Sequence, residues 1–156
     1  MGRGIEGEEH NMAKSAYCDG ACRVSNPGLC SCGWVLLDEK GDVVDWKGYF
    51  LGHGHTNNFA EYMGLVYLLE YLYSHEIKGV KIYSDSALVV NQVNQSWQTN
   101  NPDLKNLNMK AYGLILAGSH ILAHVKGHSG SAGNEMADKI CNDILDHNEE
   151  FYGKQE

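Results

Sequence analysis

Four acidic residues, Asp19, Glu61, Asp85 and Asp138, occupy positions at which carboxylates could bind divalent metal ions. Asp19 ends a predicted strand, Asp85 ends another, and Glu61 lies in the first turn of a predicted helix. Open α/β sheets bind ligands at the edge where strands end and helices begin. Two-metal hydrolysis of a phosphodiester needs acids from several elements, and Mg²⁺ prefers oxygen ligands. The four acids therefore suit a metal-dependent nuclease site, which their types and spacing alone leave as a hypothesis.

Three of these acids also have structural explanations. Asp19 precedes a glycine, and this dipeptide is common in turns. Asp85 precedes a predicted helix, where it could cap the helix N-terminus. Asp138 lies near the start of another predicted helix, where the helix dipole favours negative charge. Residue types alone do not decide between these structural roles and metal binding.

Glu61 is the acid that a structural explanation fits least well. It follows Asn58 by three residues, which is the spacing of a capping box. Its neighbours, however, are apolar, and a carboxylate among them needs a partner: Phe59, Ala60, Tyr62 and Met63.

The elements that must position the acids follow the order β-β-β-α-β-α-α-β-α. Turn signals at Asn26-Pro27-Gly28 and at residues 39–42 separate the first three strands and predict an antiparallel meander. We predict an α/β sheet with helices packed on its faces. The predicted strands span residues 15–19, 31–37, 43–51, 80–84 and 121–125, and the predicted helices span residues 59–73, 86–95, 103–116 and 134–145.

Length and composition fit one domain. The chain has 156 residues, of which 43% are apolar, and this excludes a wholly disordered chain. We predict a flexible N-terminal tail at residues 1–13, the domain at residues 14–147, and a C-terminal tail at residues 148–156. No apolar run is long enough for a membrane span, and the first residues lack the apolar core of a secretory signal. A cytoplasmic monomer is the expectation.

The net charge of −8 argues against a nucleic-acid partner. The objection weakens if several acids bind divalent ions, because the ions invert the local charge.

Cysteine and histidine residues raise the question of zinc. The five cysteines are odd in number and follow no signal peptide, which indicates reduced thiols in the cytosol. Their spacings differ from paired zinc knuckles, so buried thiols are favoured over a zinc site. Two histidines at residues 52–55 lack a third ligand nearby, and a flexible loop is favoured there.

Five short segments surround the acids and the glycine-rich stretch before the last helix: Tyr17-Cys18-Asp19-Gly20-Ala21, Asn57-Asn58-Phe59-Ala60-Glu61, Ile82-Tyr83-Ser84-Asp85-Ser86, Val125-Lys126-Gly127-His128-Ser129-Gly130 and Gly133-Asn134-Glu135-Met136-Ala137-Asp138. Together they resemble type 1 ribonuclease H, in a form without the basic protrusion of many bacterial relatives. The resemblance implies a ribonuclease H-like fold, with a five-stranded mixed sheet, three antiparallel strands first, flanked by helices. It also implies an endoribonuclease that hydrolyses the RNA strand of RNA–DNA hybrids with two Mg²⁺ ions, which Mn²⁺ can replace. The products would carry 5′-phosphate and 3′-hydroxyl ends.

The resemblance also implies roles for individual residues. Asp19 would bridge both ions, Glu61 and Asp85 would serve the leaving-group side, and Asp138 the water side. Glu61 would also accept a hydrogen bond from a 2′-hydroxyl, the group that distinguishes RNA from DNA. His128 would assist proton transfer or product release, and its ordinary pKa of about 6.5 suits that chemistry.

Substrate contacts follow from the same resemblance. Asn26, Thr56 and Asn57 match positions that contact the nucleic-acid backbone, and Cys22 matches a minor-groove position. Turn and cap chemistry explains the polar positions equally well. One extra residue between Cys22 and Asn26, and Ala87 where a polar residue often stands, depart from the family pattern.

The missing protrusion affects the expected affinity. Residues 96–102 contain no Lys or Arg, and Trp97 could either stack on substrate or pack against the protein. We therefore predict modest affinity with few phosphate contacts.

Two other functions are compatible with the same fold. A non-catalytic hybrid-binding module is disfavoured because all four acids are present. A related nuclease or integrase-type enzyme is disfavoured by the Lys126-Gly127-His128 segment and by residues 134–138.

Overall fold

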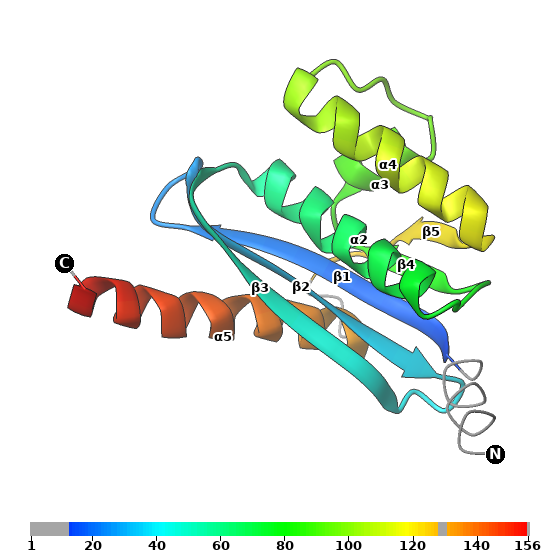
Figure 1. Cartoon of the computed structure of the whole chain (residues 1–156), viewed down its shortest axis with the longest axis horizontal. Coiled ribbons are helices and arrows are strands. Elements are labelled where there is room, and N and C mark those ends of the chain that lie inside the picture. The colour runs from blue at the N-terminus through cyan, green and yellow to red at the C-terminus, as the bar shows by residue number, and fades with distance from the viewer. Residues whose placement is uncertain (1–12, 128–130, 156) are drawn as a thin grey trace.

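The structure is a computed structural model and describes residues 13–127 and 131–155 (Figure 1). Within these residues the elements follow the order β-β-β-α-β-α-α-β-α, which confirms the predicted order. The strands are β1 (Ala13–Arg23), β2 (Gly28–Asp38), β3 (Val43–His55), β4 (Lys81–Ser84) and β5 (Ile121–His124). The helices are α2 (Asn57–Ser74), α3 (Ala87–Val93), α4 (Pro102–Gly118) and α5 (Ala132–Gln155).

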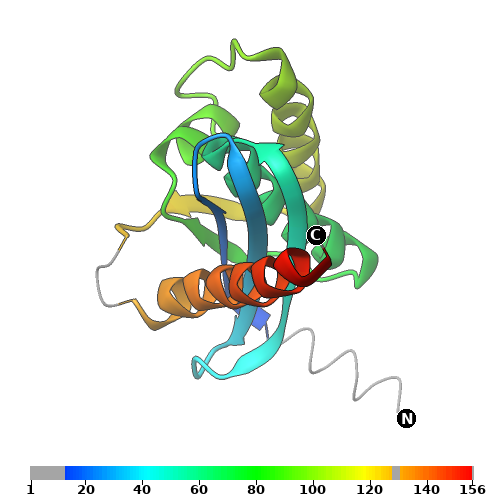
Figure 2. The same ribbon diagram turned by 90° about the vertical axis from the view of Figure 1, so that its left-hand side faces the viewer.

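The strands form one mixed sheet in the order β3-β2-β1-β4-β5. The first three strands pair antiparallel, whereas β4 pairs parallel with both β1 and β5. The five-stranded mixed sheet implied by the resemblance is thereby confirmed. Helix α5 crosses one face of the sheet, and α2, α3 and α4 cover the other (Figures 1 and 2).

Helix α2 lies at the centre of the core, between the sheet and α4. Its sequence is apolar on most sides, and four leucines are almost completely buried: Leu65, Leu68, Leu69 and Leu72. They belong to one cluster with side chains from β1 and β2, including Ala16, Trp34 and Leu36. Burying one such leucine contributes roughly 1.5–3 kcal/mol, so this helix is held mainly by packing.

Some boundaries differ from prediction. Residues 52–55 continue β3, where a loop was predicted, and His55 pairs with Gly28. Gly52 and Gly54 have φ angles of 86° and 82°, which glycine adopts without strain, and the register between β2 and β3 shifts in this region. Strand β1 continues through Arg23, four residues beyond its predicted end at Asp19.

Helix α5 runs through Gln155, beyond the predicted end at residue 145. The predicted domain boundaries remain a prediction, and residues 1–12 lie outside the described part of the chain. In the residues described, no helix has the length and apolar character needed to cross a membrane.

The cysteines correct one expectation. Cys22 of β1 lies directly opposite Cys30 of β2 in the sheet register, and the two form a disulfide. The prediction of reduced thiols is therefore wrong for this pair. Cys18, Cys32 and Cys141 are free and buried, as the sequence led us to expect.

Candidate active site

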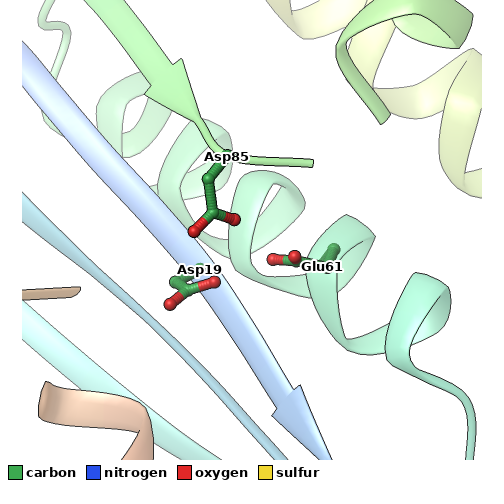
Figure 3. Close-up of side chains that lie close together, drawn as sticks. All are labelled: Asp19, Glu61 and Asp85. Carbon is green, nitrogen blue, oxygen red and sulfur yellow. The ribbon is translucent and has the colours of Figure 1, made fainter. Parts of the chain in front are cut away.

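Three acids from three elements converge at one place beside β1 (Figure 3). Asp19 comes from the middle of β1, Glu61 from the start of α2, and Asp85 from the residue after β4. One ligand oxygen from each lies within 4.8 Å of the others. Among the acidic, histidine and cysteine side chains of the described residues, these three acids form the group close enough to bind a metal ion.

Two glycines bring α2 against β1 closely enough to form this group. A Cβ atom on Gly20 would lie 2.2 Å from the carbonyl carbon of Ala60, and a Cβ on Gly64 would lie 2.5 Å from the carbonyl oxygen of Asp19. No side chain fits at either position without movement of the backbone. The glycines therefore set the distance between Asp19 and Glu61.

Hydrogen bonds then fix the two carboxylates. The Gly20 N–H donates to Oε1 of Glu61 at 2.8 Å and to Oδ1 of Asp19 at 2.9 Å. Glu61 thus has the partner that its apolar neighbours require.

The structural explanations for Asp19, Glu61 and Asp85 do not hold. Asp19 lies inside β1, opposite Gly33, and not in a turn. The N-cap of α2 is Thr56, whose hydroxyl accepts from the Phe59 N–H at 3.1 Å, so Asn58 and Glu61 form no capping box. The N-cap of α3 is Ser86 rather than Asp85.

Electrostatics make the cluster a candidate cation site. Burial, together with the nearby Asp85 carboxylate, raises the pKa of Asp19 to about 7. Burial and the Asp19 carboxylate raise the pKa of Glu61 above its ordinary range. A divalent cation would relieve this repulsion, and an all-oxygen donor set suits a hard ion such as Mg²⁺.

The other two predicted catalytic residues, Asp138 and His128, are not part of this group of three acids. Asp138 lies on α5, and its charge contributes to the raised pKa of Asp19, although it is outside the group of three. His128 lies outside the described residues. Neither the histidines at residues 52–55 nor the cysteines form a metal-ligand group in the residues described.

Two contacts to Asp85 were missed by sequence reasoning. Asn134, which is 4% exposed, donates from Nδ2 to Oδ2 of Asp85 at 3.4 Å, and its own Oδ1 has no partner in the described structure. A ring nitrogen of His124, Nε2, lies 3.2 Å from the Asp85 carbonyl oxygen. Asn134 belongs to one of the five segments that carry the family resemblance, whereas no local pattern marks His124.

The predicted substrate residues gather where the β1–β2 turn meets the start of α2. Oδ1 of Asn26 accepts a hydrogen bond from the Asn57 N–H at 2.9 Å, beside the helix cap Thr56. Cys22 is bonded to Cys30, and both sulfur atoms lie near the His55 carbonyl oxygen. Turn and cap chemistry is thus present at these positions, and contact with substrate remains a prediction.

The amino-acid sequence is similar to that of known proteins. The sequence model of the family described as RNase H matches residues 11–145. Ribonuclease HI of Halobacterium salinarum is 37% identical over 132 residues, which cover 84% of this chain and 63% of that protein. The chain thus spans less than two thirds of that relative's length.

Solved structures with similar folds belong to proteins of the same name. RNase H1 from the same halophilic archaeon matches with a TM-score of 0.76 and 36% identity, covering 85% of this chain and 97% of that one. LC11-RNase H1 in complex with an RNA/DNA hybrid matches with a TM-score of 0.75 and 27% identity, covering 86% and 97% of the two chains.

Proposed function

This chain belongs to the ribonuclease H family, and from that premise we propose that it is an endoribonuclease acting on the RNA strand of RNA–DNA hybrids. The observation that carries the proposal is the convergence of Asp19, Glu61 and Asp85 within 4.8 Å. LC11-RNase H1 was crystallised with an RNA/DNA hybrid, which supports this choice of substrate. Hydrolysis would leave 5′-phosphate and 3′-hydroxyl ends.

The four acids are proposed to hold two Mg²⁺ ions, which Mn²⁺ can replace. Asp19 would contribute to both ions, Glu61 and Asp85 to the ion on the leaving-group side, and Asp138 to the ion on the water side. When bound, the ions supply activation of the attacking water and stabilisation of the leaving 3′-oxygen.

Glu61 is proposed to distinguish RNA from DNA. Its carboxylate is held in place by the Gly20 N–H, so one oxygen is oriented before substrate arrives. A carboxylate held in this way can accept a hydrogen bond from a 2′-hydroxyl, which DNA lacks. His128 is proposed to assist proton transfer or product release, and Cys22, Asn26, Thr56 and Asn57 to contact the hybrid.

A cleavage assay tests the proposal. The full chain is incubated with end-labelled RNA–DNA hybrid, duplex RNA, duplex DNA and single strands, with Mg²⁺, with Mn²⁺ or with EDTA. We expect cleavage of the RNA strand of the hybrid with either metal and none with EDTA. Asp85→Asn should reduce cleavage to background, whereas Asp42→Asn, which changes an exposed acid in the β2–β3 turn, should leave it unchanged.

Two results would contradict the proposal. Hybrid left intact with both metals would reject the activity, and binding of that hybrid without cleavage would favour a non-catalytic binding module. Cleavage of duplex DNA in preference to hybrid would favour a related nuclease. A monomeric state and a cytoplasmic location also remain predictions, and gel filtration checks the first.

A further inference from the structure

Asp85 differs from the other two acids of the cluster in how its backbone is held. Asp19 lies within β1, where it pairs with Gly33 of β2, and Glu61 lies within α2, so regular secondary structure holds both backbones. Asp85 belongs to neither kind of element. It lies between the end of β4 at Ser84 and the start of α3 at Ala87.

The polar groups of Ser84 and Ser86, the residues on either side of Asp85, already have hydrogen-bond partners. The Ser84 carbonyl accepts from the Val125 N–H at 2.9 Å, and the Ser84 hydroxyl accepts from the Ser86 N–H at 3.1 Å. The Ser86 hydroxyl caps α3 through the Val89 N–H at 3.2 Å. These bonds fix the residues on both sides of Asp85, but they do not involve Asp85 itself.

The carbonyl oxygen of Asp85 contacts His124, the last residue of β5. Nε2 of His124 lies 3.2 Å from this oxygen, and His124 is adjacent to Ser84 in the parallel register of β4 and β5. A carbonyl oxygen only accepts, so Nε2 carries the hydrogen in this contact. A side chain of β5, the edge strand, thus contacts the backbone of Asp85, a candidate metal ligand.

We propose that His124 is a positioning residue for the metal site: it holds the Asp85 carbonyl and thereby directs the Asp85 carboxylate toward Asp19 and Glu61. Asn134 contacts the side chain of the same residue, with Nδ2 3.4 Å from Oδ2 of the Asp85 carboxylate. Rotation of the junction would move the Asp85 oxygen away from the cluster, whose ligand atoms lie within 4.8 Å of one another. This inference rests on the proposed metal-dependent function.

Loss of His124 is expected to weaken metal binding without preventing folding, because the side chain is exposed on an edge strand. A neutral hydrogen bond of this kind corresponds to roughly a two- to tenfold change in an equilibrium constant. His124→Ala should therefore raise the Mn²⁺ dissociation constant by this factor. His124→Gln, whose amide N–H can still donate to the carbonyl, should restore most of the affinity.

Binding of Mn²⁺ to the full chain without substrate, measured by calorimetry, tests this directly, and cleavage at increasing Mn²⁺ concentration gives a second measurement. His147→Ala, which removes an exposed histidine on α5, is the matched control and should change neither. Unfolding in EDTA shows whether each variant is folded at the assay temperature. A purely structural role would lower stability in EDTA and leave the Mn²⁺ dissociation constant of the folded protein unchanged.

The inference is overturned if His124→Ala binds Mn²⁺ as tightly as the parent, or if His124→Gln is no better than His124→Ala. Failure of the proposed function would give a different result from failure of this inference. In that case the parent binds Mn²⁺ but leaves the hybrid intact, and the calorimetric comparison of the variants still decides the role of His124. A parent chain that binds no Mn²⁺ overturns both.

Discussion

The backbone N–H of Gly20 donates a 2.8 Å hydrogen bond to Oε1 of Glu61, which ties the centre of β1 to the start of α2. The bond exists because neither Gly20 nor Gly64 places a side chain between the strand and the helix. The geometry of the acidic cluster is therefore set by the absence of two β-carbons as much as by the presence of three carboxylates.

Substitution of Gly64 by alanine should move α2 away from β1. The new Cβ would lie 2.5 Å from the Asp19 carbonyl oxygen, a backbone atom that cannot rotate aside. We expect destabilisation of about 1–3 kcal/mol, typical of overpacking, together with weaker metal binding because Glu61 moves with the helix. Urea unfolding and Mn²⁺ calorimetry measure the two effects.

Gly113→Ala is the matched control for that substitution. Gly113 lies within α4, and a Cβ there meets no atom within 4 Å. Alanine should stabilise the helix by about 0.5–1 kcal/mol and leave metal binding unchanged. Equal effects of the two substitutions would contradict the role assigned to Gly64.

The metal-free protein should become less stable as the pH rises, because Asp19 then loses a proton that the folded state holds. The folded state holds this proton up to a pKa of about 7, whereas an unfolded aspartate releases it near 4. Between these values the unfolded state binds fewer protons, so the free energy of unfolding falls with increasing pH. Urea midpoints in EDTA between pH 4 and pH 8 should show this decline, and Asp19→Asn should make it smaller.

Mg²⁺ should reverse that trend, because the ion binds the deprotonated carboxylates. The increase in midpoint on adding Mg²⁺ should be larger at pH 8 than at pH 5. An Asp19→Asn variant with the same pH dependence as the parent would show that another group is responsible.

The affinity for hybrid should depend only weakly on salt. The chain carries a net charge of −8, and residues 96–102 have no Lys or Arg. Each neutralised phosphate contributes roughly −0.7 to −0.9 to the slope of log K against log salt concentration. Fluorescence anisotropy with a labelled hybrid and the Asp85→Asn variant measures the slope, and a value equivalent to eight or more contacts would overturn the prediction.

Reduction of the Cys22–Cys30 disulfide should destabilise the protein. The two residues are separated by 8 positions, and closing a loop of this size stabilises a fold by roughly 2–3 kcal/mol. Urea unfolding with and without dithiothreitol should therefore differ for the parent. A variant with Cys22→Ala and Cys30→Ala should be insensitive to dithiothreitol. Mass spectrometry of the alkylated, non-reduced chain that found all five thiols free would disprove the pairing.

Periodic and local signals in the sequence were sufficient for the order of the elements. The apolar segment around Leu65 and Leu69 predicted a buried helix, and the turn signal around Pro27 separated β1 from β2. Boundaries were less predictable where glycine stands, since Gly52 and Gly54 are as compatible with a bulged strand as with a loop.

Contacts between distant segments were beyond sequence reasoning. The pairing of Cys22 with Cys30 depends on the register between β1 and β2, which no local pattern specifies. The contact of His124 with Asp85 depends likewise on the neighbouring positions of β4 and β5. The acids themselves were found because a resemblance joined five segments that spacing alone would have left as turns and caps.

The central position of β1 has a consequence for how the protein folds. This strand pairs with β2 through a short turn, but it pairs with β4 only after α2 has crossed the sheet. Non-local pairing of this kind is intrinsically slow, because loop closure must precede the contacts that stabilise it. We therefore expect Asp19 to meet Asp85 only once β1 and β4 have paired. Metal affinity should then appear together with the native state, and newly made chains would gain it only once the sheet is complete.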